Sequence, residues 1–122
     1  MRTLIAAPAL LLLTIVFGSI VIVAQALGVP DGAGSIYERC ARWWAQGMLL
    51  ASGTRVVLHD AERIRTGEAR IFVANHVSWY DVLVLVAKLP RYSFVAKAEI
   101  FRVPLFGPAA RAVGTIPIQR EN

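Results

Sequence analysis

The first feature of the chain is a long apolar stretch near its N-terminal end. No charged residue occurs between Leu4 and Pro30, and the run from Leu4 to Ala26 is almost continuously apolar. As an α-helix this run would be roughly 35 Å long at 1.5 Å per residue, enough to cross a hydrocarbon core of about 30 Å. The pattern therefore predicts a membrane-spanning or membrane-inserted helix within residues 1–30.

Two other interpretations of this stretch stay open. In a secretory signal peptide, Arg2 would precede the apolar run and Ala24-Gln25-Ala26 would be an A-x-A cleavage site, although the run is longer than the usual h-region of about 7–15 residues. A buried or interfacial helix is the other alternative. For a retained helix, the basic residues that follow it, Arg39 and Arg42, favour an inner membrane with the rest of the chain on the cytoplasmic side.

A second helical pattern follows the turn residues 30–34. Ser35 and Glu38 have the spacing of a capping box. The apolar stripe behind it comprises Ile36, Cys40, Trp43, Trp44, Gly47, Met48 and Ala51, and the polar residues that fall mostly away from it are Glu38, Arg39, Arg42 and Gln46. This stripe can pack on the domain core or lie in the membrane interface, where tryptophan and arginine are favoured. Residues 31–52 are therefore predicted to form an amphipathic interfacial helix.

Beyond Gly53 the pattern changes to short apolar runs typical of strands. Strands are expected at residues 55–59, 70–74, 92–96 and 115–118. Pro117 would make the last of them an edge strand or a bulge. A helix is expected to follow His76 and to end near Leu89, and a second short helical region would reach Val113. Strands that alternate with helices predict an α/β fold with parallel pairings.

Composition and charge restrict the partners. The chain is 57% hydrophobic and 17% charged, more apolar than an ordinary soluble domain. Its net charge of +5 suits anionic lipid headgroups or phosphorylated substrates, whereas scattered basic residues and the lack of a recognised module give little support to nucleic-acid binding. A single cysteine, two histidines and the absence of a Walker loop or a G-x-G-x-x-G motif lead us to expect no metal and no cofactor.

The candidate chemistry lies in the segment Asn75-His76-Val77-Ser78-Trp79-Tyr80-Asp81, between an expected strand and an expected helix. Ligands usually bind at this edge of an α/β sheet. Ser78 and Asp81 have the spacing of an S-x-x-D cap. From the first helical turn, the Asp81 carboxylate could turn back and hold one nitrogen of His76, which leaves the other nitrogen free to accept a proton. On spacing alone, Asp81 could equally be only a cap and His76 only a loop residue.

Four segments, in this order and spacing, resemble the phospholipid and glycerol acyltransferase family, the 1-acylglycerol-3-phosphate acyltransferases and their relatives. Asn-His-x-Ser-x-x-Asp at residues 75–81 resembles the first signature of that family, and Phe94–Ile100 resembles its lysine-containing segment. Val103–Gly107 resembles its proline-glycine turn, and Gly114–Arg120 resembles its second signature, which ends in arginine. Pro117 and Gln119 differ from the commoner sequence of that second signature, Phe-Ile-Asp-Arg.

The resemblance implies acyl transfer from acyl-CoA or acyl-carrier protein to the free hydroxyl of a lysophospholipid, above all 1-acylglycerol-3-phosphate (lysophosphatidic acid). His76 would be the general base and Asp81 the acid that orients it, as in triad chemistry without the serine. Lys97 and Arg120 would hold the acceptor phosphate. Residues with a structural part at the site would be Asn75, Ser78 and Gly114.

Two later family signatures are missing, a Glu-Gly-Thr-Arg-Ser-like segment and a terminal proline-containing one. We therefore expect residues 53–122 to be the N-terminal part of a catalytic domain, with an incomplete mixed or parallel sheet and flanking helices, and this chain to be incomplete and inactive by itself. The alternatives are a non-catalytic membrane-anchored remnant or binding module, or an acyltransferase with another acceptor. Such acceptors would be glycerol-3-phosphate, another lysophospholipid or an acylated amino-acid lipid.

Overall fold

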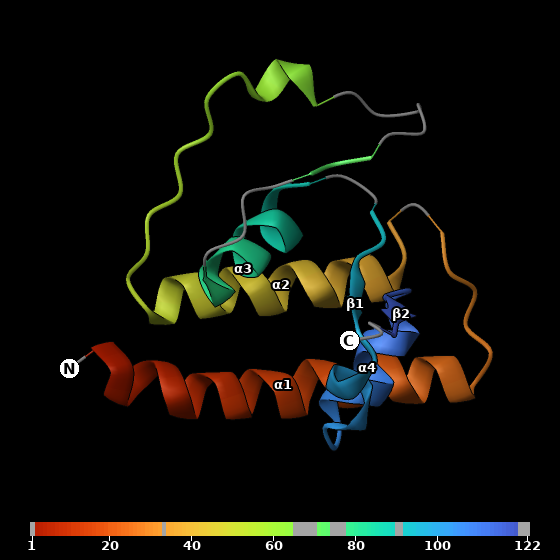
Figure 1. Cartoon of the computed structure of the whole chain (residues 1–122). Coiled ribbons are helices and arrows are strands. Elements are labelled where there is room, and N and C mark those ends of the chain that lie inside the picture. The colour runs from red at the N-terminus through yellow and green to blue at the C-terminus, as the bar shows by residue number, and fades with distance from the viewer. Residues whose placement is uncertain (1, 33, 65–70, 74–77, 90–91, 120–122) are drawn as a thin grey trace.

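The computed structural model describes residues 2–32, 34–64, 71–73, 78–89 and 92–119 (Figure 1). Four α-helices are present among them: α1 (Arg2–Ala26), α2 (Ile36–Ala51), α3 (Trp79–Lys88) and α4 (Phe106–Ala112). Two short strands, β1 (Val95–Lys97) and β2 (Ile116–Ile118), and two 3₁₀ turns, Ala61–Arg63 and Ala98–Arg102, complete the described elements. Figure 1 shows α1, α2 and α3 stacked side by side, with α4 against the C-terminal half of α1.

The apolar run forms one continuous helix, α1, as its sequence predicts. By length and composition, its span Thr3–Ala26 can cross a membrane, with a mean hydropathy of 2.6. Most of this helix is exposed (Leu11, for example, to 65%), which counts against a helix buried in the core of a soluble domain. The buried apolar side chains of this helix, Val21 and Ala24, lie in its C-terminal half.

The cap that begins α2 differs in detail from the predicted capping box. The Ser35 Oγ accepts a hydrogen bond from the Glu38 backbone N–H at 3.3 Å, as expected. The Glu38 carboxylate, however, accepts from the N–H of Gly34 at 3.0 Å instead of that of Ser35. The Ser35 N–H donates to the Gly32 carbonyl, so each of these N–H groups has a partner in the turn.

Helix α2 is buried on two faces, because it lies between α1 and α3. Toward α3, the core consists of Ala45, Met48 and Leu49 from α2 and Leu83, Val86 and Ala87 from α3. Toward α1 and α4, it consists of Val21, Ala24, Tyr37, Cys40 and Ala112. The single apolar stripe predicted for this helix was therefore incomplete. Trp43, one of its members, is 48% exposed, and its ring packs 6.3 Å from that of Phe17.

Two close contacts fix α1 against α2. The Trp44 indole N–H donates to the Thr14 hydroxyl at 3.0 Å, halfway along α1. Gly47 of α2 lies against Leu13, and a Cβ at Gly47 would come within 3.0 Å of that side chain. These contacts place the middle of α2 beside the middle of α1.

The predicted parallel pairing is present in β1 and β2, where Val95 pairs with Ile116 and Lys97 with Ile118. β1 begins at Val95, three residues later than the strand predicted at residues 92–96. Tyr92 and Phe94 pack instead against the α2–α3 core, with their ring centroids 5.0 Å apart. The backbone of Phe94 nevertheless reaches β2, because its carbonyl accepts a hydrogen bond from the Ile116 N–H at 2.7 Å. Pro117 lies within β2, as the prediction of an edge strand allows.

Two predicted strands are not observed in the described residues. Residues 55–58 have no regular structure and a bend follows at 59–60, while 71–73 are also irregular. Arg70 and Ala74, the ends of the second predicted strand, lie outside the described residues. A strand needs a neighbouring strand to satisfy its backbone groups, and the described sheet contains only β1 and β2. Most apolar side chains of these segments stay exposed, Ile71 and Val73 to 92% each, while Val56 packs on the α2–α3 core without strand pairing. An apolar pattern alone therefore did not produce strands.

A tight turn leads from the 3₁₀ turn at 98–102 into α4. Gly107 leaves no room for a side chain, because a Cβ there would collide with the Phe101 carbonyl group. Leu105 has φ +65°, a left-handed conformation that is unusual for leucine. The turn places Leu105 and Ala109 against Gly18 of α1, where a Cβ would lie 3.5 Å from each side chain. The proline-glycine turn therefore docks α4 onto the apolar helix.

Candidate active site

The best-described part of the candidate site is the beginning of α3. The Ser78 Oγ accepts from the N–H of Tyr80 at 3.1 Å, and an Asp81 carboxylate oxygen accepts from the N–H of Ser78 at 2.9 Å. The capping box that the sequence predicts is thus present, with both reciprocal bonds. It turns the partly buried Asp81 carboxylate back toward the segment that precedes the helix.

The position of Asp81 also has an electrostatic consequence. The unpaired N–H groups at a helix N-terminus favour negative charge, so a carboxylate in the first turn of α3 is stabilised there. The same end of the helix would attract any other anionic group that approaches it.

His76 and Asn75 lie outside the described residues. In sequence, His76 precedes the Ser78 cap by two positions, on the side toward which the Asp81 carboxylate turns. The pairing of His76 with Asp81 therefore stays a prediction, and the observed cap agrees with it.

Lys97 and Gly114 lie at opposite ends of the two parallel strands, Lys97 at the C-terminal end and Gly114 before the N-terminal end. Lys97 is the last residue of β1, is exposed, and pairs in register with Ile118 at the end of β2. Gly114 precedes β2 in the left-handed region, with φ +88°, near Ser93. Arg120 follows Ile118 by two positions but lies outside the described residues. The parallel register therefore places Lys97 beside Ile118 at the end of β2, two positions before Arg120 in the sequence.

The described site residues thus fall into two groups on different elements. Ser78 and Asp81 are joined by the cap of α3, which packs along α2, whereas Lys97 belongs to the β1–β2 sheet, which contacts the 3₁₀ turn at 98–102. Among the described residues, no group of three or more His, Cys, Asp or Glu side chains comes together that could hold a metal ion.

Two other titratable groups are held in their protonated forms. Burial raises the pKa of the Cys40 thiol, in agreement with its interpretation as a small core residue, and its side chain is only 1% exposed. Burial also raises the pKa of Tyr92 to about 12, with a smaller opposing effect of nearby Arg42 and a raising effect of Glu38. Neither group is therefore ionised near neutral pH.

Sequence reasoning missed the role of Arg42. Its side chain was predicted to fall mostly away from the apolar stripe of α2, but it points to α3, where its Nη2 donates to the Leu89 carbonyl at 3.0 Å. The same nitrogen lies 3.4 Å from the Glu38 carboxylate. The available signal was its spacing, since Arg42, Ala45 and Leu49 lie three and four residues apart on one helical face.

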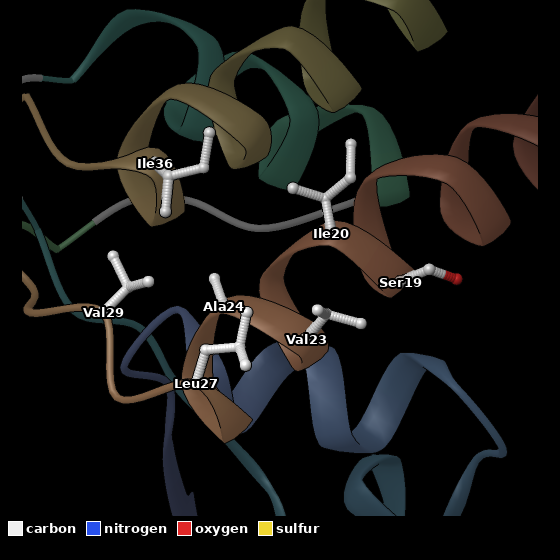
Figure 2. A pocket seen from close by; sticks show the side chains of 7 residues that line it. All are labelled: Ser19, Ile20, Val23, Ala24, Leu27, Val29 and Ile36. Atoms are coloured by element: carbon white, nitrogen blue, oxygen red, sulfur yellow. The ribbon is translucent and has the colours of Figure 1, made fainter.

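An open apolar groove of about 500 Å³ lies on the C-terminal half of α1. Figure 2 shows its lining side chains, which come from α1, from the connection to α2 and from the first residue of α2: Ser19, Ile20, Val23, Ala24, Leu27, Val29 and Ile36. None of the predicted site residues belongs to this lining, which offers no group for acid–base chemistry.

The acyltransferase family model matches residues 55–122, more than half of the chain. The region includes the capped start of α3, both strands and all the residues predicted for the site. The chain therefore belongs to the acyltransferase family. This confirms the family that the four sequence segments resemble.

Several proteins named as lipid acyltransferases are similar to the chain. A lyso-ornithine lipid O-acyltransferase of Pseudomonas aeruginosa is 38% identical over 84 residues, which is 68% of this chain and 31% of that protein. Its counterpart in Rhizobium meliloti is 37% identical over 82 residues, 66% of this chain and 27% of that protein. A 1-acyl-sn-glycerol-3-phosphate acyltransferase of Neisseria gonorrhoeae is 40% identical over 52 residues, 43% of this chain and 20% of that protein. The matches thus span less than a third of the length of these relatives, and no solved structure matches the chain.

Proposed function

We propose that this protein transfers an acyl group from acyl-CoA or acyl-carrier protein to the free hydroxyl of a lyso-lipid. The observation that carries this proposal is the capped Ser78–Asp81 turn inside the family match, directly after the sequence Asn75-His76. In the reaction, His76 accepts the hydroxyl proton as the oxygen attacks the thioester carbonyl. The new C–O ester bond forms, the C–S bond breaks, and the thiolate leaves and takes up a proton. Asp81 holds the imidazole in one tautomer and stabilises its charged form.

The similarity favours lyso-ornithine lipid as the first acceptor to examine. The two lyso-ornithine lipid acyltransferases match about two thirds of the chain, whereas the glycerol-phosphate relative from Neisseria matches 43%. The glycerol-phosphate acceptor is the second candidate, because a basic chain with Lys97 and Arg120 suits a phosphate. An ornithine headgroup also carries a carboxylate, which an arginine can bind with the same two-pronged geometry.

The proposal is tested by offering the purified full-length protein each acceptor with labelled acyl-CoA or acyl-carrier protein. Conversion of lyso-ornithine lipid to the diacyl lipid is expected, and conversion of 1-acylglycerol-3-phosphate would identify the second candidate. Hydrolysis of the donor without transfer to either lipid, or no consumption of the donor at all, would refute the assigned reaction.

The anion-binding part of the proposal predicts a selective effect on the acceptor. Arg120→Ala and Lys97→Ala should raise the KM for the anionic acceptor about tenfold or more, with little change in the KM for the acyl donor. Steady-state kinetics with each substrate varied in turn measures this. Arg102→Ala, a change of an exposed basic residue in the turn after Lys97, is the matched control. Equal changes in both KM values would remove these two residues from the acceptor site.

For the whole chain we propose that residues 1–30 anchor the protein in the inner membrane, residues 31–52 lie at its interface and residues 53–122 form the N-terminal part of a glycerolipid acyltransferase-like catalytic domain on the cytoplasmic side. Support comes from the exposed apolar surface of α1 and from the basic residues that follow it. The protein is expected to stay in the membrane fraction through alkaline carbonate washing and to be cut by protease only from the cytoplasmic side. A mature N-terminus at Leu27 would show that α1 is a cleaved signal peptide.

A further inference from the structure

The contact between Arg42 and Leu89 joins two helices whose common core, in the described residues, is apolar. The α2–α3 core consists of aliphatic side chains and the thioether of Met48, which gain little from one particular axial position over another. At the end of this core, the Arg42 guanidinium spans 47 positions of sequence to reach the Leu89 carbonyl at 3.0 Å. A hydrogen bond from a charged donor is directional, so it favours one position of α3 along α2 among those that apolar packing tolerates.

Leu89 needs such a partner. It caps the C-terminus of α3 with an extended backbone, is only 7% exposed, and its carbonyl is one of those that a helix leaves without an internal partner at this end. A positive charge is also favoured at a helix C-terminus. The position of Arg42 is itself controlled, since Glu38 holds the same nitrogen and is tied in turn to the cap of α2.

The two ends of α3 therefore have different attachments. Arg42 of α2 holds the C-terminal end, and the N-terminal end bears Ser78 and Asp81 in the capping box. An α-helix of 10 residues is short and stiff, so the placement of its last turn determines where its first turn lies. Figure 1 shows α3 lying along α2, which lies along α1.

We propose that Arg42 is a positioning residue for acyl transfer. It sets the axial position of α3 on α2 and thereby the place from which the Asp81 carboxylate acts. This inference rests on the proposed function of Asp81, and it assigns to the amphipathic helix a part in turnover in addition to any part in membrane association.

The test is a double-mutant cycle in the full-length protein, with Arg42→Met and Asp81→Asn. Methionine keeps an unbranched stem of similar width but removes the donor and the charge. A misplacement of about 1 Å can cost up to about 10²-fold in rate, so we expect Arg42→Met to lower kcat about tenfold with both KM values changed less than twofold. In the Asp81→Asn background, the same change should lower single-turnover rates less than twofold, because the group that Arg42 positions is already disabled.

Arg42→Lys should recover kcat to within about threefold, because an ammonium group can still donate to one carbonyl oxygen. Arg39→Met, at an exposed position of the same helix, is the matched control and should leave kcat unchanged. If Arg42→Met does not fold, Glu38→Gln takes its place in the cycle, with an expected loss of about threefold because it removes only the charge that holds the guanidinium.

The outcomes separate the two proposals. A tenfold loss for Arg42→Met that is equally large with and without Asp81→Asn would overturn the positioning role and leave only a structural one. Equal activity of Arg42→Met and Arg39→Met would overturn it as well. If Asp81→Asn alone has wild-type activity, the proposed function of Asp81 is wrong, and the positioning inference falls with it.

Discussion

Replacement of His76 by alanine is expected to lower the kcat/KM of acyl transfer by about 10²–10⁴-fold, the usual contribution of a general base. The acceptor hydroxyl is a poor nucleophile at neutral pH, and without the imidazole its proton would have to pass to water. Histidine suits this step because its ordinary pKa is about 6.5, close to the operating pH. Labelled diacyl lipid formed from the lyso-lipid and the acyl donor measures the effect.

The other histidine of the chain provides the control. His59 is exposed and lies in the bend that follows residues 55–58, so His59→Ala removes an imidazole without touching the candidate site. Both variants should bind membranes and unfold at the wild-type temperature. Near-wild-type turnover of the His76 variant would end its assignment as the base.

Replacement of Asp81 by asparagine is expected to cost about 10²-fold or more in kcat, through loss of the negative charge that stabilises the imidazolium. Asparagine keeps the shape of the side chain, and its carbonyl oxygen can still accept from the Ser78 N–H, so the cap of α3 survives. The free energy of unfolding should change by less than about 1 kcal/mol. This separates the catalytic use of Asp81 from its structural use, which spacing alone could not do.

Asp60→Asn is the matched change at an exposed aspartate. Asp60 has φ +55°, a conformation that asparagine also adopts readily, and its side chain makes no capping hydrogen bond. The Asp60→Asn variant should have the activity of the wild type. Asp81→Asn should lower kcat. A change confined to the KM for the acceptor would contradict the orienting role of Asp81 and would indicate a direct contact with the lipid.

Several features were predictable because they depend on residues close together in the sequence. The Ser35 and Ser78 caps each arise within one helical turn, and α1 is one uninterrupted apolar run of neighbouring residues. The position of Pro117 likewise follows from its own lack of an N–H donor. The candidate site was recognised from the segment 75–81, and the described half of that segment forms the predicted cap.

Strands were less predictable, because a strand is stable only with a partner that the local sequence does not name. Residues 55–59 and 71–73 have the apolar character of strands but no neighbouring strand among the described residues, and most of their side chains stay exposed. β1 is also shorter than predicted. Tyr92 and Phe94, the first residues of the predicted strand, pack their rings on a core supplied by two distant helices, and of these two only Phe94 has a backbone hydrogen bond to β2 among those described.

By itself, the sequence determined the helices, their N-cap serines and the membership of an acyltransferase family, since periodicity, capping and short motifs are local properties. Only the tertiary structure decided that α2 is buried on two faces and that Arg42 turns inward to the Leu89 carbonyl, 47 positions away. A helix placed between two others has no single polar side. Which of its charged residues face water then depends on neighbours from other parts of the chain, because each buried charge must find a partner there.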